Sequence, residues 1–317
     1  MKPAFSIIFF TVASGAGLGL LSLAALFDVL AAGRLPPQAL WRGALLGLVL
    51  VAAGLASSTL HLANPKNAWL SLARVRTSWL SREAALAVLL FPLAGLYVAL
   101  SARGSAGFAR VLLALVTAAI SWGVLVCTAM IYASLKPIRQ WHTAWTPVNY
   151  VLLGHWSGAL LLAAIAAAYG SPPRSLAMIA GAIGWLALAA KLGYWHATSR
   201  GTPTTLAHAI GVDQGVRGAG ASAAARARLL DVGHSRGTFL TREFGFALAQ
   251  RHANVLRGVA LVLGFGLPLA FLAWGNGRWE VTLSIAACCI IGLLVERWLF
   301  FAEARHTVRL FHGDART

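Results

Sequence analysis

Long apolar runs separated by short polar segments dominate this chain, and their lengths are those of membrane-spanning helices. A hydrocarbon core about 30 Å thick is crossed by about 20 apolar residues in a helix. Runs that meet this requirement lie at residues 5–30, 40–61, 84–101, 108–133, 147–169, 175–195, 254–274 and 279–302. Turn-forming Gly, Pro, Asn and Ser gather between most of them. The pattern predicts an all-α integral membrane protein, a bundle of eight transmembrane helices forming one domain over residues 1–317.

Composition supports this prediction and excludes a soluble enzyme. Of the 317 residues, 59% are hydrophobic and only 11% are charged. Soluble domains have about 25% charged residues, so this chain has too few charges to cover a water-exposed surface. The three cysteines, Cys127, Cys288 and Cys289, lie in apolar runs without metal-ligand spacing. We interpret them as small buried hydrophobic residues.

Residues 197–252 break the apolar pattern, because they are polar, rich in Gly and Arg, and too charged to lie in lipid. We expect a long polar loop between the sixth and seventh helices. In its second half Phe239, Phe244 and Leu248 lie near helical spacing. An interfacial helix, a surface covered by a partner and a solvated linker all fit this segment.

The distribution of Lys and Arg predicts the orientation. With eight spans both termini lie on one side, which collects 20 of the 26 Lys and Arg residues, against 6 on the other side. Without the long loop the bias is still 11 to 6. Positive charge marks the cytoplasmic side of membrane proteins, so we expect cytoplasmic termini in a bacterial inner membrane. The net charge of +17 follows mostly from this bias and calls for no nucleic-acid partner.

Titratable and aromatic residues concentrate between the second and third helices. The candidate site residues are His61, Asn64, Lys66, Trp69, Arg74 and Glu83. An imidazole and a carboxylate exchange protons near neutral pH, and Trp69 with the apolar span ends could hold a flat ring. An apolar pocket with a few convergent polar groups is what a quinone site requires. The alternative is an ordinary basic loop with anchoring tryptophans.

The segment "LHLANPKNAWLSLARVRTSWLSRE" resembles the membrane anchor of the dimethyl sulfoxide reductase family, which has a similar stretch after its second helix. The resemblance continues through Trp145-Thr146-Pro147 in "WHTAWTP" and through Arg297 in "ERWLFF", and it covers most of the eight spans. The chain departs from the family pattern at Ala63 and Asn67, where the family has glycine and arginine.

The resemblance implies a function and partners. Anchors of this family hold a molybdopterin catalytic subunit and a four-cluster iron–sulfur subunit on the membrane and exchange electrons with ubiquinone or menaquinone. The family's quinol-binding histidine falls on His61, and its glutamate falls on Glu83. Because the partners should dock on the side of His61, the charge count implies a cytoplasmic complex, which is similar to the sulfite-oxidising relatives. A quinol-oxidising anchor of the dimethyl sulfoxide reductase type is the alternative.

Three other classes compete with this interpretation. A transporter usually shows inverted repeats and broken helices, which the sequence lacks. A purely structural anchor would leave His61 and Glu83 without a role. A b-type haem subunit would need two histidines at matching depth on different helices. The candidate haem ligands are His155 together with His196 or His252.

Overall fold

The computed structural model describes residues 3–59, 65–170, 174–200, 205, 247–274 and 277–312, except for the side chains of 65–68, 71, 247–251, 311 and 312. Within these residues the chain is helical and has no strand. Eight helical segments are long and apolar enough to cross a membrane. They are α1 (Phe5–Leu30), α2 (Pro37–Thr59), α3 (Trp79–Ala102), α4 (Phe108–Ala133), α5 (Trp145–Ala168), α6 (Arg174–Arg200), a seventh span (His252–Trp274) and α12 (Trp279–Ala302). The prediction of an all-α bundle with eight spans is confirmed.

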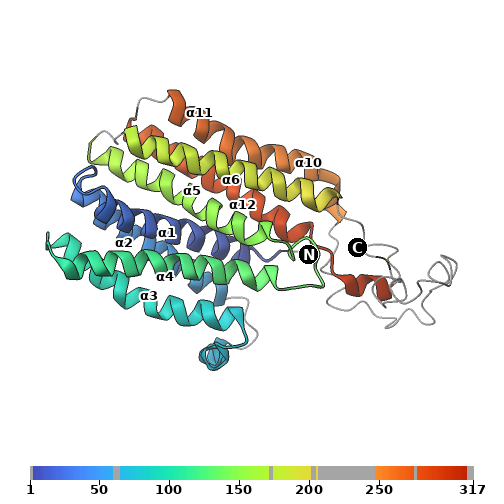
Figure 1. Cartoon of the computed structure of the whole chain (residues 1–317). Coiled ribbons are helices and arrows are strands. Elements are labelled where there is room, and N and C mark those ends of the chain that lie inside the picture. The colour runs from blue at the N-terminus through green and yellow to red at the C-terminus, as the bar shows by residue number, and fades with distance from the viewer. Residues whose placement is uncertain are drawn as a thin grey trace, which may run out of the picture.

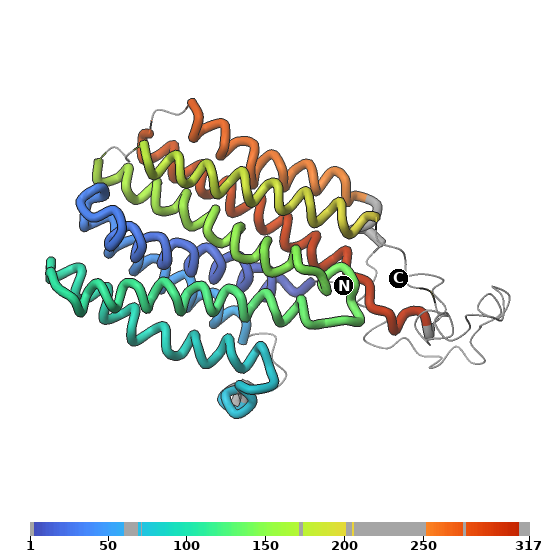
Figure 2. The backbone as a smooth tube through the Cα atoms, viewed as in Figure 1, coloured from blue at the N-terminus to red at the C-terminus, as the bar shows by residue number. Residues whose placement is uncertain are grey.

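The first helix lies at the centre of the bundle. It packs against α2, α4, α5 and α12, and most of its residues are buried. α3 pairs with α4 on one flank, whereas α6, α12 and the seventh span form the other flank (Figures 1 and 2). The seventh span runs through α10 (Ala247–Leu261), a π-helical turn η3 (Val262–Gly266) and α11 (Leu267–Trp274).

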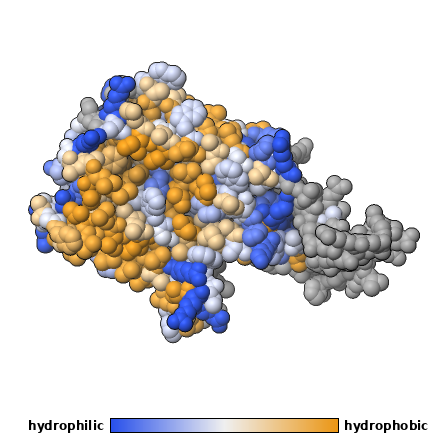
Figure 3. Space-filling view, in the orientation of Figure 1, coloured by the Kyte–Doolittle hydropathy of each residue, from blue (hydrophilic) through white to orange (hydrophobic). Residues whose placement is uncertain are grey.

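The outer surface has the distribution that a membrane requires. The face in Figure 3 is largely hydrophobic along the helices, with hydrophilic side chains gathered towards their ends and on one projecting segment. Large apolar side chains such as Val88, Leu112 and Trp185 are exposed. An apolar surface of this extent is unfavourable in water and favourable against lipid.

Glycines bring the central helices into backbone contact. A Cβ atom added to Gly17 on α1 would lie 2.6 Å from the carbonyl oxygen of Gly47 on α2. One added to Gly154 on α5 would lie 2.8 Å from the oxygen of Gly15. Gly15 and Gly19 are four residues apart, as are Gly154 and Gly158, so two small-residue faces meet along the α1–α5 crossing. In lipid, where water does not drive helices together, such close packing stabilises association.

Helix boundaries differ most from the prediction at the start of α3 and around the loop 197–252. α3 begins at Trp79 instead of residue 84, because Ser78 has an extended conformation and its hydroxyl accepts a hydrogen bond from Ser81 N (3.4 Å). Arg82 and Glu83 are therefore helical. The predicted loop 197–252 is helical at both of its ends, because α6 continues to Arg200 and α10 begins at Ala247. Its Phe239 and Phe244 lie outside the described residues, as does the side chain of Leu248.

The two ends of the bundle differ in charge. Where α1 begins and α12 ends, the described basic residues are Arg74, Arg76, Arg82, Lys136, Arg139, Arg200, Arg257, Arg305 and Arg309. We call this the basic end. The opposite end has Arg34, Arg42, Arg103, Arg110, Arg174 and Arg278.

Candidate functional site

Glu83 is a buried carboxylate close to the basic end. It lies in the second turn of α3 and is only 3% exposed. The hydroxyl of Thr128 on α4 donates a hydrogen bond to Glu83 Oε1. Desolvation of an ionisable side chain inside a membrane bundle is costly, so such residues are usually retained for a function. Glu83 is therefore a candidate for a group that takes part in chemistry.

The segment before α3 is tied to its first turn. A short 3₁₀ helix η1 (Pro65–Arg74) runs across the start of α3 instead of along the bundle (Figure 1). Arg82 donates to the carbonyl oxygens of Val75 (2.9 Å) and Arg76 (2.7 Å), and its guanidinium lies over the ring of Trp79 at 4.2 Å. Arg82 thus holds the exit of η1 against the first turn of α3. The sequence interpretation missed this role, because Arg82 read only as one more positive charge.

The remaining predicted residues of this segment are placed less completely. His61 and Asn64 lie outside the described residues, and of Lys66 only the backbone is described, within η1. Trp69 is 68% exposed, and Arg74 is also exposed. Glu83 points into the bundle whereas Trp69 and Arg74 are on its surface, so the described residues do not form a closed slot. The roles of these residues stay predictions.

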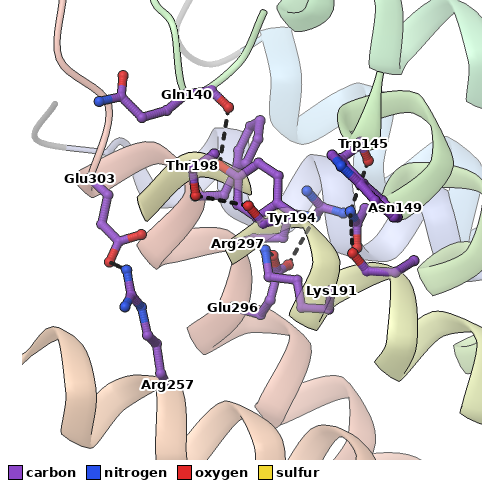
Figure 4. A network of polar contacts seen from close by, with 12 residues as sticks. Gln140, Trp145, Asn149, Lys191, Tyr194, Thr198, Arg257, Glu296, Arg297 and Glu303 are labelled. Atoms are coloured by element: carbon purple, nitrogen blue, oxygen red, sulfur yellow. Dashed lines mark hydrogen bonds and ion pairs between the residues drawn. The ribbon is translucent and has the colours of Figure 1, made fainter. Parts of the chain in front are cut away.

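A second buried polar network joins α6 and α12 (Figure 4). Lys191 Nζ donates to Glu296 Oε1, and Arg297 Nε lies 3.3 Å from Glu296 Oε2. This second contact is an ion pair without hydrogen-bond geometry, since Oε2 has no hydrogen-bond partner. The three residues are 1%, 0% and 4% exposed. Sequence reasoning singled out Arg297 by resemblance and missed Lys191 and Glu296.

The Trp-Thr-Pro motif has a structural role at the start of α5. The Thr146 hydroxyl donates to Trp141 O (2.8 Å), and the indole of Trp141 donates to Phe300 O on α12 (3.0 Å). Asn149 donates to Trp145 O (2.8 Å). The motif therefore fixes the start of α5 against α12.

His155 does not fit haem ligation in its present arrangement. Its Nδ1 lies 2.8 Å from Val151 O and its Nε2 lies 3.0 Å from Ser22 Oγ. A neutral ring that donates from Nδ1 and accepts at Nε2 satisfies both contacts, which leaves no nitrogen free for iron. His196 and His252 are exposed. No group of three or more His, Cys, Asp or Glu in the described part of the chain could bind a metal ion. The haem ligands stay a prediction without geometric support.

The helices and the buried charges define a multi-pass membrane protein with ionisable groups gathered near one end of its bundle. Comparison with known proteins places it more narrowly. Residues 1–301 match the family described as DMSO reductase anchor subunit (DmsC), and the chain belongs to this family. The chain is also 35% identical over 334 aligned positions to the C subunit of the sulfite dehydrogenase of Allochromatium vinosum, covering 98% of this chain and 99% of that protein. The resemblance seen in the sequence is confirmed.

Proposed function

We propose that this chain is the membrane anchor and quinone-reactive subunit of a molybdopterin and iron–sulfur oxidoreductase. It exchanges electrons between the quinone pool and a catalytic dimer on the cytoplasmic side, which oxidises sulfite. Glu83 carries the proposal, because it is a buried carboxylate near the basic end, held by a hydrogen bond from Thr128 on α4. Family membership and the similarity to one subunit of a sulfite dehydrogenase support it.

Electron transfer to or from a quinone requires proton exchange at the site. A quinone takes up two electrons together with two protons when it is reduced, and the quinol releases them when it is oxidised. Glu83 would exchange these protons with the aqueous phase at the basic end, with His61 as the second acid–base group. Thr128 orients the Glu83 carboxylate. Asn64, Lys66, Trp69 and Arg74 belong to the same segment and would contact the ring or its carbonyl oxygens.

The positive-inside rule supports a cytoplasmic basic end and a location in the bacterial inner membrane. We expect single cysteines introduced at Arg76 and Arg305 to react with a membrane-impermeant reagent only from the cytoplasm, and those at Arg103 and Arg278 only from outside. Background labelling should be low, because Cys127 and Cys289 are buried and the partly exposed Cys288 lies in the middle of the apolar helix α12. Labelling of Arg76→Cys from outside would reverse the orientation and remove the argument for a cytoplasmic complex.

The substrate is tested on the assembled complex. We expect inner membranes that contain this chain and its partners to reduce an added quinone when sulfite is supplied. Deletion of this chain should abolish that reaction, whereas sulfite oxidation with an artificial dye should persist in the soluble fraction. Quinol oxidation by dimethyl sulfoxide, with no response to sulfite, would instead identify a reductase-type anchor.

A further inference from the structure

Polar side chains of five helices form one layer at a similar depth below the basic end. Glu83 lies four residues from the start of α3, Tyr150 five residues from the start of α5, and Arg297 five residues from the end of α12. At a helical rise of ~1.5 Å per residue these three positions are all roughly 6–8 Å from the helix ends. Tyr132, which stacks on Tyr150, and Lys191, which binds Glu296, bring α4 and α6 into the same layer.

The contacts within this layer connect Glu83 to the Lys191–Glu296–Arg297 cluster. Thr128, which binds Glu83, is one helical turn before Tyr132 on the same face of α4. Tyr132 stacks on Tyr150, with 5.8 Å between ring centroids. The guanidinium of Arg297 lies 3.9 Å from the centre of the Tyr150 ring. Two stacked aromatic rings therefore lie between the face of α4 that carries Thr128 and the guanidinium of Arg297.

The cluster has an excess of positive charge. With all three side chains ionised, the cluster holds two positive charges, on Lys191 and Arg297, and one negative charge, on Glu296. The nearby pair of Arg257 and Glu303 (2.7 Å) is neutral as a whole and lies closer to the surface. Lys191 Nζ also lies 4.2 Å from the centre of the Tyr194 ring, a cation–π contact. A charge surrounded by apolar helices is poorly screened and acts over longer distances than a charge in water.

We propose that the excess charge of the Lys191–Glu296–Arg297 cluster favours the ionised form of Glu83, so that Lys191 and Glu296 act as positioning residues for proton exchange at the candidate quinone site. The role of this coupling in proton exchange with quinone rests on the proposed function. The electrostatic effect of the cluster on Glu83 does not depend on it. Among the described residues, the other titratable groups that interact electrostatically with Glu83 are Cys127 and Tyr132 on α4 and Tyr150 on α5, and Arg82 precedes it on α3. Arg82 is already bound to the carbonyl oxygens of Val75 and Arg76.

The coupling can be read directly from the Glu83 carboxyl group by infrared spectroscopy of the purified complex. The band of the protonated acid is assigned by its loss in Glu83→Gln and is then titrated with pH. Lys191→Met lowers the cluster charge by one, so the midpoint should rise, by on the order of half a pH unit. Glu296→Gln raises the charge by one and should lower the midpoint by a similar amount.

The double variant Lys191→Met/Glu296→Gln separates charge from packing. It restores the original cluster charge, so we expect its midpoint to return close to that of the wild type, although two side chains have changed. Lys191→Arg keeps the charge and should keep the midpoint. If Glu296→Gln does not assemble, the comparison of Lys191→Met with Lys191→Arg decides the question.

A matched control lies at the other end of the bundle. Arg110→Met removes one charge from the ion pair with Asp28, which also binds the Tyr97 hydroxyl (3.2 Å). Tyr97 is fourteen residues after Glu83 on α3, about 21 Å along the helix, so this variant should leave the midpoint unchanged. Equal midpoints in wild type, Lys191→Met and Lys191→Arg would overturn the proposal. Shifted midpoints together with quinone turnover that is indifferent to Glu83→Gln would uphold the coupling and refute the quinone role.

Discussion

The complex that carries His61→Ala is expected to lose quinone-linked turnover by about 100-fold or more while its catalytic subunits still oxidise substrate with an artificial dye. A positioned acid–base group typically contributes 10²–10⁴-fold to a rate, and the proposed site has few groups able to replace an imidazole. Turnover with a soluble quinone analogue and dye-linked turnover should be measured on the same purified preparation. Binding of a quinone-site inhibitor should weaken in parallel.

Glu83→Gln should also reduce quinone turnover strongly, because it removes the exchangeable proton and keeps the size of the side chain. His306→Ala is the matched control. His306 also lies at the basic end and is partly buried, and this burial lowers its pKa, so that it is mostly neutral at pH 7. It is not part of the proposed site and should leave turnover unchanged. Full quinone turnover in His61→Ala, or loss of the assembled complex, would replace the quinone role of His61 with a structural one.

The number and position of the helices could be predicted from the sequence, because lipid requires one continuous apolar run for each span. The start of α3 could not be predicted from hydropathy alone. Arg82 and Glu83 are polar, and their place in the helix depends on the Ser78 cap and on Thr128 of another helix. As a result, Glu83, expected just before the third helix, lies in the second turn of α3 with its side chain buried.

The buried ion cluster was predictable only in part. Arg297 was singled out by the resemblance. Lys191 counted only as one basic residue near the end of a span, and the sequence does not indicate which residue pairs with Glu296. The two residues are 105 positions apart in the sequence and meet only because α6 and α12 both pack on α5. Pairing of this kind depends on helix rotation and neighbour choice, which local periodicity does not determine.

The glycine contacts at the α1–α5 crossing lead to the largest expected effect on folding. A Cβ atom on Gly19 would overlap the backbone of Gly154, and a helix backbone cannot move aside as a flexible side chain can. Gly19→Ala should therefore separate α1 from α5 and destabilise the bundle by about 3 kcal/mol, the upper part of the usual range for overpacking. The thermal stability of the purified complex and the amount of the chain in membranes should both fall.

Gly181→Ala on α6 is the matched control for this substitution. Nothing lies within 4 Å of a Cβ atom at Gly181, so the same change meets open space. Alanine also favours a helix over glycine by roughly 1 kcal/mol, so Gly181→Ala should be neutral or slightly stabilising. Because both variants add one methyl group to a transmembrane helix, only the α1–α5 contact distinguishes them. Equal stability of the two variants would contradict a direct backbone contact between α1 and α5.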